Sequence, residues 1–483
     1  MTLSASAARG SAVTLFFQAI KLVVMLASIV VLARLISPDQ YGLMAMAMAM
    51  IGIAEIFRDF GLSTAALQAK DLTSQQQSNL WWINLAIGAT LTLVVFLLAH
   101  PIAGFYGQPD LIPVIQVVSV IYLLGSASTQ FRVHINRQLR FVALSTADVV
   151  PYALGFFAAL WMALLGAGVW ALVAQQIVAA LSGLILSVIF AHWWPGLPRR
   201  ASMSNLVKFG LSLAATQTIS YATRNVDSIA LGRVWGASVV GTYDRAYQLM
   251  VMPLNQINAP LSKVAIPVLA RLQDEKERLV AYIRQAQLVA IYVTAAGFAL
   301  LAALGPQVVE VLLGPAWGPS GLIVSALAVG GVFRSLVQIC YWIYMSQGLA
   351  TAQLKYFAVA QPLLIAVTLA GLPWGALGVA VAHSLGFGLY WVASLLWVGR
   401  VAKIQVGPLF HDAARGVLLF GAPAGALAWL AVALTPALPP VLEILIGVGI
   451  ALIWFAVART VFPRIREDIG ALIRFAKLAL SRK

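Results

Sequence analysis

The chain has 483 residues, of which 61% are hydrophobic and 10% are charged, and its formal net charge is +15 at pH 7. Soluble domains carry about 25% charged residues, so this composition excludes an ordinary soluble protein and indicates a polytopic membrane protein. Most basic residues fall in alternate connections between apolar segments, which is the pattern that orients membrane proteins. We therefore attribute the positive charge to membrane topology and expect no nucleic-acid partner.

Apolar runs of about twenty residues, each long enough to cross about 30 Å of hydrocarbon, recur from end to end. We predict an all-α polytopic membrane protein with about fourteen transmembrane helices. Their approximate positions are 12–36, 42–66, 80–100, 112–131, 144–165, 168–191, 205–231, 240–266, 283–304, 320–346, 355–373, 375–399, 414–435 and 440–462. The first run is too long for the apolar core of a cleaved signal, so we interpret it as a membrane span.

The predicted spans fall into two six-helix lobes, at 1–200 and 201–400, followed by spans 13 and 14 within 401–463. Lys and Arg gather in the loops after even-numbered spans and at the C-terminus, so the positive-inside pattern places both termini in the cytoplasm. In the tail, 464–483, apolar residues share one helical face and basic residues the other. This pattern predicts an interfacial helix attracted to anionic membrane lipid.

A short pattern repeats at a constant offset. The first predicted span ends at Arg34 and is followed by Gly42, and the seventh ends at Arg233 and is followed by Gly241. The spacing from Arg to Gly is the same in both places. Two parallel halves with a site between them are an arrangement found in transporters, and chance similarity of apolar sequence is the alternative explanation.

Several charges lie inside the predicted spans: Lys21 in the first, Arg224 and Asp227 in the seventh, and Arg334 in the tenth. Each costs about 2.5–3.5 kcal/mol to insert, so we expect a compensating role in a hydrated, net positive cavity that holds an anionic group such as a pyrophosphate. Two alternatives remain open. Arg224 and Asp227 share one helical face and can satisfy each other, and Lys21 can extend to the inner surface.

Three further charges, Glu55, Arg58 and Asp59, interrupt the inner end of the second span, where a solvated ion-pair cluster competes with a substrate contact. Asp148 opens the fifth predicted span, so its alternative role is to stabilise a helix N-terminus. For coupling transport to an ion gradient, our candidates are Asp227 first and Asp148 second.

The chain has no nucleotide-binding loop, zinc-protease motif or dinucleotide fingerprint, so we expect no catalytic residue, no metal and no cofactor. The single cysteine, Cys340, excludes a disulfide within the chain. The histidines are scattered near predicted span ends and read as interfacial polar residues: His100, His134, His192, His383 and His411. A membrane glycan polymerase or ligase would be expected to carry a sizeable outer loop with catalytic candidates, and the predicted outer connections are short.

Several motifs resemble those of Wzx-type polysaccharide flippases, in the lipopolysaccharide and exopolysaccharide branch of the multidrug/oligosaccharidyl-lipid/polysaccharide exporter superfamily. They include LARLISPDQYG followed by FRDFGLSTAALQAKDLT, and LLGAGVWALVAQQ at Leu164–Gln176. The strongest match is RNVDSIALGRVWGASVVGTYDRAYQLMVMP with the following KVAIPVLARLQDE. The resemblance covers almost the whole chain.

This resemblance implies alternating access between two six-helix lobes and two extra C-terminal helices. It implies movement of an undecaprenyl-pyrophosphate-linked oligosaccharide across the bacterial inner membrane, without ATP, with polysaccharide assembly proteins as partners. It makes four basic residues candidates for binding the lipid pyrophosphate or acidic sugars: Lys21, Arg58, Arg224 and Arg334. An ion-coupled exporter of drugs or small molecules from the same superfamily is the alternative.

Overall fold

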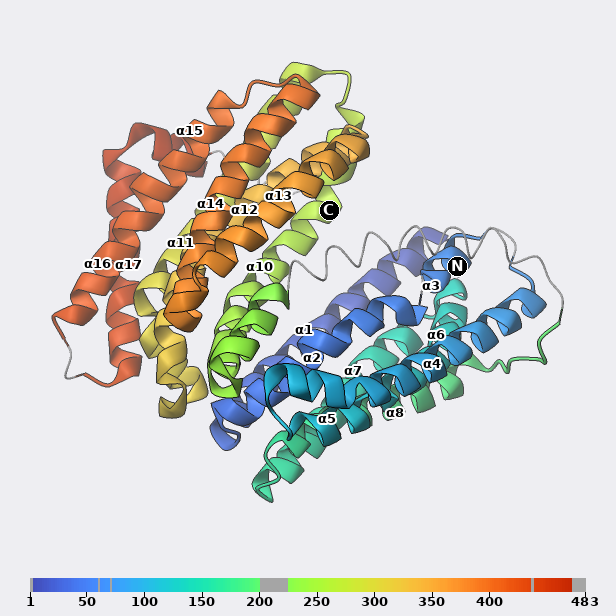
Figure 1. Cartoon of the computed structure of the whole chain (residues 1–483). Coiled ribbons are helices and arrows are strands. Elements are labelled where there is room, and N and C mark those ends of the chain that lie inside the picture. Colours follow the sequence, from blue (N-terminus) through green and yellow to red (C-terminus); the bar gives the residue numbers. More distant parts are fainter. Residues whose placement is uncertain (1–2, 60, 70–71, 200–224, 436–437, 471–483) are drawn as a thin grey trace. The chain divides into compact units, whose positions relative to one another are not determined.

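The structure is a computed structural model that describes residues 3–59, 61–69, 72–199, 225–435 and 438–470, and every regular element in these ranges is a helix (Figure 1). The described part contains 10 helical segments that are long and apolar enough to cross a membrane. Helices suit lipid because they satisfy their own backbone hydrogen bonds. The predicted all-α polytopic fold class is confirmed.

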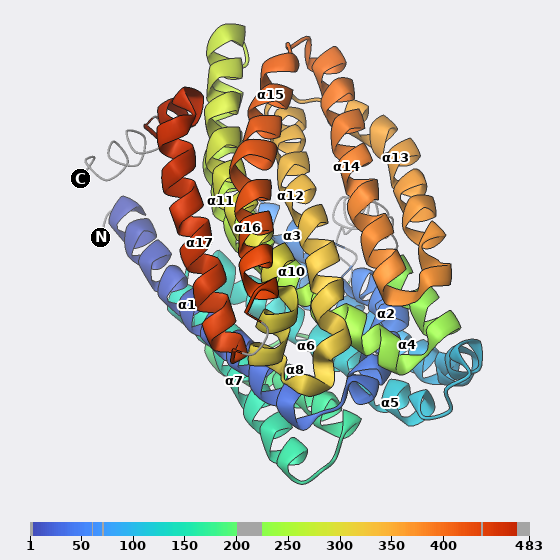
Figure 2. The same ribbon diagram turned by 90° about the vertical axis from the view of Figure 1, so that its left-hand side faces the viewer.

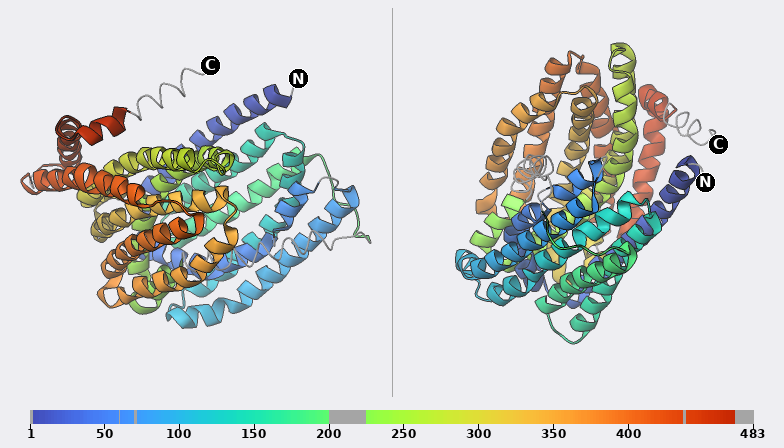
Figure 3. Two further views of the ribbon diagram at one scale, coloured as in Figure 1. Left: turned by 90° about the horizontal axis from the view of Figure 1, so that it is seen from above. Right: turned by 90° about the vertical axis from the view of Figure 1, so that its right-hand side faces the viewer.

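The chain forms two compact units, Met1–Gly241 and Thr242–Lys483. In the first unit the helices pack closely, as α7 and α8 do side by side in the right panel of Figure 3. Residues 225–235 are also helical. The helices of this unit are α1 (Leu3–Leu35), α2 (Pro38–Asp59), α3 (Leu62–Gln68), α4 (Ser74–Tyr106), α5 (Leu111–Val118), α6 (Val120–Arg137), α7 (Phe141–Leu164) and α8 (Val169–Ala191).

In the second unit α11 packs against α12, α16 and α17, which Figure 2 shows beside one another. Helix α10 begins in the first unit and continues into the second. The helices are α10 (Ala237–Arg271), α11 (Lys276–Leu313), α12 (Gly318–Ser346), α13 (Ala350–Ala370), α14 (Gly375–Ala402), α15 (Gly407–Arg415), the π-helix η3 (Gly416–Gly421), α16 (Ala422–Ala433) and α17 (Pro440–Val461). The predicted lobe boundary at residue 200 lies outside the described residues, so the lobe bounds remain a prediction.

Each predicted span meets a described helix, the seventh only in residues 225–235, but some spans are divided. The second span breaks between α2 and α3, where Gly61 adopts the left-handed conformation with φ 65°. Glycine enters this region without steric cost, so it ends one helix and begins another. The fourth span is divided between α5 and α6 at Ser119, and the thirteenth contains the π-helix η3. Hydropathy alone does not detect these breaks.

The polarity of the helices is arranged for a lipid surrounding. Along α4, Asn84 and Ser78 are buried inside the unit, whereas Leu93 and Leu97 are exposed. Large exposed apolar side chains match a hydrocarbon environment, and the hydroxyl of Ser78 donates inside the unit to the carbonyl oxygen of Ser74 at 2.9 Å. The interior of each unit is therefore where charged and polar chemistry is concentrated.

The start of α2 crosses the start of α10 at two glycines. A Cβ on Gly42 would lie 1.7 Å from the carbonyl oxygen of Ala237, and a Cβ on Gly241 would lie 1.9 Å from that of Pro38. Pro38 stands four residues before Gly42, just as Ala237 stands four residues before Gly241, so the contact is reciprocal. Only glycine lets two helix backbones approach this closely. These are the glycines of the Arg-to-Gly repeat seen in the sequence.

Candidate functional site

A cavity of about 520 Å³ lies within the first unit, among α2, α3, α6, α7 and α8. We call it the Arg58 cavity. Its charged lining residues are Arg58, Arg132 and Asp148, so its formal charge is positive. Hydroxyl and amide groups from α3 and α6 also line it: Ser63, Ser128, Thr129 and Asn136. Each of the two arginines also pairs with a carboxylate, Arg58 with Glu55 and Arg132 with Asp148, so an anionic group that enters this space must compete with those carboxylates.

Arg58 reaches this cavity from the last turn of α2. Its Nε donates to Oε1 of Glu55 at 2.9 Å, and its Nη1 donates to Oγ1 of Thr129 at 3.3 Å. A Cβ on Gly125 would lie 2.7 Å from Nη1, so the absence of a side chain there makes room for the guanidinium. The predicted ion pair with Glu55 is therefore present, and Arg58 nevertheless lines the cavity. The Asp59 side chain lies outside the described part.

Asp148 lines the same cavity and forms an ion pair with Arg132 of α6. Arg132 also donates from Nη1 to the carbonyl oxygen of Ala147 at 3.4 Å. Because α7 begins at Phe141, Asp148 lies well beyond the first turn. A carboxylate stabilises a helix N-terminus only within that turn, so the alternative role that we gave to Asp148 does not apply. Its role in ion coupling remains a prediction.

Lys21 lies in the membrane-spanning part of α1, partly buried. Its Nζ is 5.5 Å from the ring centroid of Tyr152 on α7, within the range of a cation–π contact. Tyr152 follows Pro151, which lines the Arg58 cavity, although Lys21 itself does not. Among the described residues, Lys21 has no carboxylate within ion-pair distance.

Asp227 is buried at the beginning of the described helix 225–235. Its Oδ1 accepts a hydrogen bond from the backbone nitrogen of Ser228 at 2.9 Å. Arg224 lies outside the described residues, so the predicted pair between Arg224 and Asp227 also remains a prediction.

Arg334 lies on α12 in the second unit, partly buried and held by aromatic rings. Its Nη1 donates to the hydroxyl of Tyr247 at 2.8 Å. Its Cζ lies 5.4 Å from the ring centroid of Tyr247 and 4.9 Å from that of Phe387. Within the described ranges no carboxylate pairs with it. An intramembrane cation without a carboxylate partner requires water or an anionic ligand to compensate its charge.

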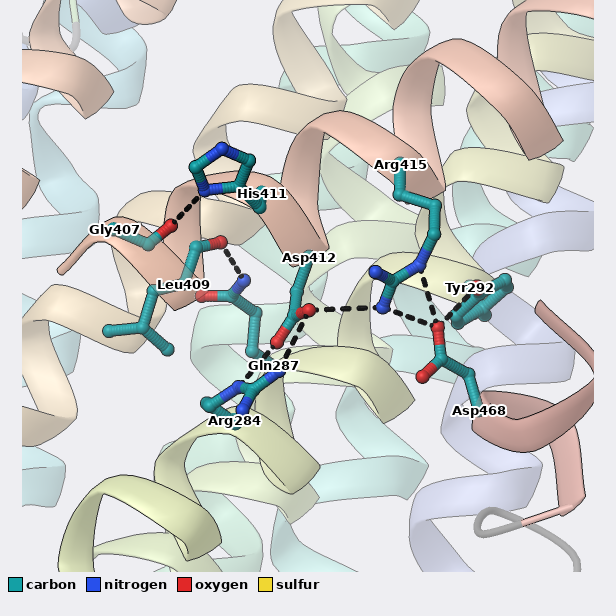
Figure 4. Close-up of polar contacts among 9 residues, drawn as sticks. All are labelled: Arg284, Gln287, Tyr292, Gly407, Leu409, His411, Asp412, Arg415 and Asp468. Atoms are coloured by element: carbon teal, nitrogen blue, oxygen red, sulfur yellow. Dashed lines mark hydrogen bonds and ion pairs between the residues drawn. The ribbon is translucent and has the colours of Figure 1, made fainter. Parts of the chain in front are cut away.

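A cluster of charged residues in the second unit is not suggested by the sequence pattern (Figure 4). We call it the Asp412 cluster: Arg284, Tyr292, Asp412, Arg415 and Asp468. The carboxylate of Asp412, whose side chain is 2% exposed, accepts from Nε of Arg284 at 2.7 Å and from Nη2 of Arg415 at 3.0 Å. Asp468 accepts from Arg415 at 2.6 Å and from the hydroxyl of Tyr292 at 2.8 Å.

This cluster joins three segments that are far apart in sequence: α11, α15 and the helical residues 463–470. Gln287 adds a bond from its Nε2 to the carbonyl oxygen of Leu409 at 2.6 Å (Figure 4). Two arginines balance two carboxylates, so the cluster leaves no net charge for a ligand. We interpret it as the attachment of the beginning of the predicted tail to the second unit, and not as a substrate site.

The fold and these intramembrane charges define a polytopic membrane protein with the architecture of known flippases and exporters. "Lipid II flippase MurJ, inward closed conformation" is similar with a TM-score of 0.69 and 14% identity, over 93% of this chain and 98% of that one. An inward-facing multidrug resistance MATE family transporter is similar with a TM-score of 0.60 and 16% identity, over 79% of this chain and 94% of that one. At such identities the likeness establishes the fold alone.

Residues 31–322 match the family described as "Polysaccharide biosynthesis protein", and the chain belongs to this family. It is 27% identical to "Lipopolysaccharide biosynthesis protein WzxC" of Escherichia coli (strain K12), over 74% of each chain. It is 24% identical to "Teichuronic acid biosynthesis protein TuaB" of Bacillus subtilis (strain 168), over 76% of this chain and 79% of that protein. The resemblance to Wzx-type proteins seen in the sequence motifs is confirmed.

Proposed function

We propose that this protein is a flippase that moves a lipid-linked oligosaccharide across the bacterial inner membrane by alternating access, for lipopolysaccharide or exopolysaccharide biosynthesis. The observation that carries the proposal is the position of Arg334, an intramembrane cation with no carboxylate partner among the described residues. An undecaprenyl-pyrophosphate carrier supplies the anion that such a cation requires, and its apolar tail matches the lipid-exposed surface of the helices.

The chemistry of the two sites suits a pyrophosphate. The planar guanidinium of arginine presents several donors that match phosphate oxygens in pairs. In the Arg58 cavity, the hydroxyl groups of Ser128 and Thr129 stand beside Arg58. Each donates to the carbonyl oxygen of Gly125, at 2.8 Å and 3.0 Å, and can still accept from a sugar hydroxyl. Lys21 and Arg224 remain further candidates for the same anion. The membership in a polysaccharide biosynthesis family and the names of the relatives support a glycan substrate over a small drug.

The finer features of the proposal follow from the charge pattern of the sequence. Both termini lie in the cytoplasm, and anionic lipid attracts the basic tail. Asp227 and Asp148 are the candidates for ion coupling, and polysaccharide assembly proteins are the expected partners. The protein moves its substrate and makes no covalent change to it, which fits the fold that it shares with a lipid II flippase.

Deletion of the gene in the native host tests this function. We expect surface polysaccharide to disappear and intact lipid-linked oligosaccharide to accumulate on the cytoplasmic side, with both restored by the wild-type gene. Enzymatic labelling of the glycan from the outside, before and after permeabilisation, locates the intermediate. Unchanged polysaccharide together with altered drug sensitivity would refute the flippase and support the small-molecule exporter.

A further inference from the structure

His383 of α14 is buried, with 7% of its surface exposed, so it is not an interfacial residue as we expected from the sequence. Its Nε2 has no hydrogen-bond partner in the described part of the protein. Buried polar atoms are nearly always hydrogen-bonded, because an unsatisfied one costs about 1–3 kcal/mol. Several buried amide and hydroxyl groups in the described part are in the same state, but an imidazole nitrogen differs from them because it can take up a proton and become a donor.

His383 and Arg334 flank the same two aromatic rings. The imidazole centroid lies 5.9 Å from the ring of Tyr247 and 4.7 Å from that of Phe387, the two rings that also contact the guanidinium of Arg334. Arg334 also acts electrostatically on the imidazole. The two side chains come from different helices, α12 and α14, which pack closely together.

Few other ionisable groups face His383. Tyr247 approaches from α10 and Arg334 from α12, while Phe387 lies on the same helix. On α13, Tyr356 is directed elsewhere, because it stacks edge-on against Tyr390 and donates its hydroxyl to the Tyr390 carbonyl oxygen at 2.8 Å. Among the groups that face His383 in the described part, Arg334 is the permanently charged one, so its charge and that of any ligand bound to it act on the imidazole.

A protonated imidazole beside Arg334 would place two like charges in a region of low dielectric constant, which is unfavourable. An anion bound to Arg334 would remove that repulsion and would offer the protonated imidazole an opposite charge. The unsatisfied Nε2 could then carry the proton as a hydrogen-bond donor. Anion binding and proton binding at these two residues thus favour each other.

We propose that Arg334 and His383 form a proton-linked anion site, in which His383 takes up a proton when the anionic phosphate group of the substrate binds Arg334. The proton moves from the solvent to the Nε2 lone pair, and it leaves again when the anion is released. The proposal rests on the flippase function for the identity of the anion. It assigns proton coupling in the second unit to a histidine. The carboxylate candidates, Asp227 and Asp148, belong to the first unit.

The test uses the purified full-length protein and inorganic sulfate, a probe that stays fully ionised throughout the range in which histidine changes charge, about pH 5 to 8. Isothermal titration calorimetry in two buffers of different ionisation enthalpy counts the protons taken up for each sulfate bound. We expect the wild-type protein to take up as much as one proton. As the pH is raised through the range in which the sulfate-bound protein loses the proton on His383, its affinity for sulfate should fall by as much as about tenfold for each pH unit.

The variant His383→Gln keeps a polar side chain that cannot change charge. It should bind sulfate with an affinity that does not depend on pH and without proton uptake. His100→Gln, which changes an exposed histidine in the C-terminal half of α4, should behave like the wild type. Arg334→Gln should lose the proton-linked part of the binding, and any sulfate held by other cations should bind without proton uptake.

Each other outcome contradicts the proposal. No sulfate binding by the wild type, binding without proton uptake, or equal uptake by wild type and His383→Gln would overturn it. If His383→Gln does not fold, the proposal is still tested by the number of protons that the wild-type protein takes up and by the loss of that uptake in Arg334→Gln. The gene deletion reports separately on the proposed function. If the deletion strain keeps its surface polysaccharide while the purified protein binds sulfate with proton uptake, the flippase function is refuted but the anion site is not.

Discussion

Arg58 and Arg334 are held in two different ways, and the difference bears on how each can serve a substrate. Arg58 shares its charge with Glu55 and lines a cavity, whereas Arg334 rests between Tyr247 and Phe387. A ligand at Arg58 must compete with a carboxylate, while a ligand at Arg334 meets a cation that has no carboxylate partner within the described ranges. We therefore expect Arg334 to make the stronger contact with an anion.

The pair Arg58 and Glu55 offers a test that separates a binding role from a structural one. Arg58→Gln should lower the surface polysaccharide made by the complemented deletion strain by about tenfold or more, because hydrogen bonds to charged groups contribute about 1.5–3 kcal/mol. Glu55→Gln should preserve or increase it, since Arg58 then has no competing carboxylate. Arg278→Ala is the control, because that side chain is 71% exposed and its one ion pair in the described part of the chain is with Glu275.

If both Arg58→Gln and Glu55→Gln lower the polysaccharide to the same extent at matched protein levels, the pair is structural and Arg58 does not bind substrate.

Hydropathy was sufficient to find Arg334 and Lys21, because a charge within an apolar run is visible in the sequence alone. It did not single out His383, Asp412 or Asp468. His383 is defined by rings from two helices, and the partners in the Asp412 cluster are as much as 176 positions apart. Contacts of that kind depend on which helix faces pack together, which residue spacing along one segment does not specify.

Among the elements, the attachment of residues 463–470 through the Asp412 cluster makes a prediction about stability. Asp412→Asn leaves two arginines beside one remaining carboxylate, and loss of one partner from a buried pair costs about 3–5 kcal/mol. We expect a clearly lower thermal unfolding midpoint in detergent. Glu275→Gln, which breaks the exposed pair with Arg278, should change the midpoint little, since exposed pairs contribute about 0–1 kcal/mol. Equal midpoints for both variants would contradict this assignment.

The crossing of α2 and α10 predicts a second effect on stability. Gly42→Ala places a methyl group 1.7 Å from a backbone oxygen that cannot move independently of its helix, so the helices must separate. We expect a loss of about 1–3 kcal/mol, read as a lower unfolding midpoint in detergent. Gly104→Ala on α4 is the matched control, because no atom lies within 4 Å of its Cβ position. An unchanged midpoint for Gly42→Ala would show that the two helices do not need this close approach.

Helix positions were predictable because the bilayer requires about twenty apolar residues for each crossing. The breaks within them were less visible. Gly61 precedes α3 in a left-handed backbone conformation, and the π-helix η3 interrupts the thirteenth predicted span. Both depend on local backbone geometry, to which a hydropathy window of many residues is insensitive.

At the scale of the whole molecule, the alternation of basic loops predicts the orientation in the membrane. A green fluorescent protein fused after Lys483 should be fluorescent, and an alkaline phosphatase fused at the same place should be inactive, because both termini are expected in the cytoplasm. Phosphatase fused into the connection between α11 and α12 should be active. Active phosphatase at the C-terminus would reverse the orientation and with it the assignment of inner and outer ends.

The reciprocal contact at Gly42 and Gly241 has a form that is otherwise met between separate molecules. In a two-fold symmetric dimer, residue i of one subunit touches residue j of the other, and j touches i. Here Pro38 meets Gly241 as Ala237 meets Gly42, at the same sequence offset. Each copy of the Arg-to-Gly pattern therefore supplies the glycine that the backbone beside the other copy needs, so a substitution at either glycine should disturb both contacts at once.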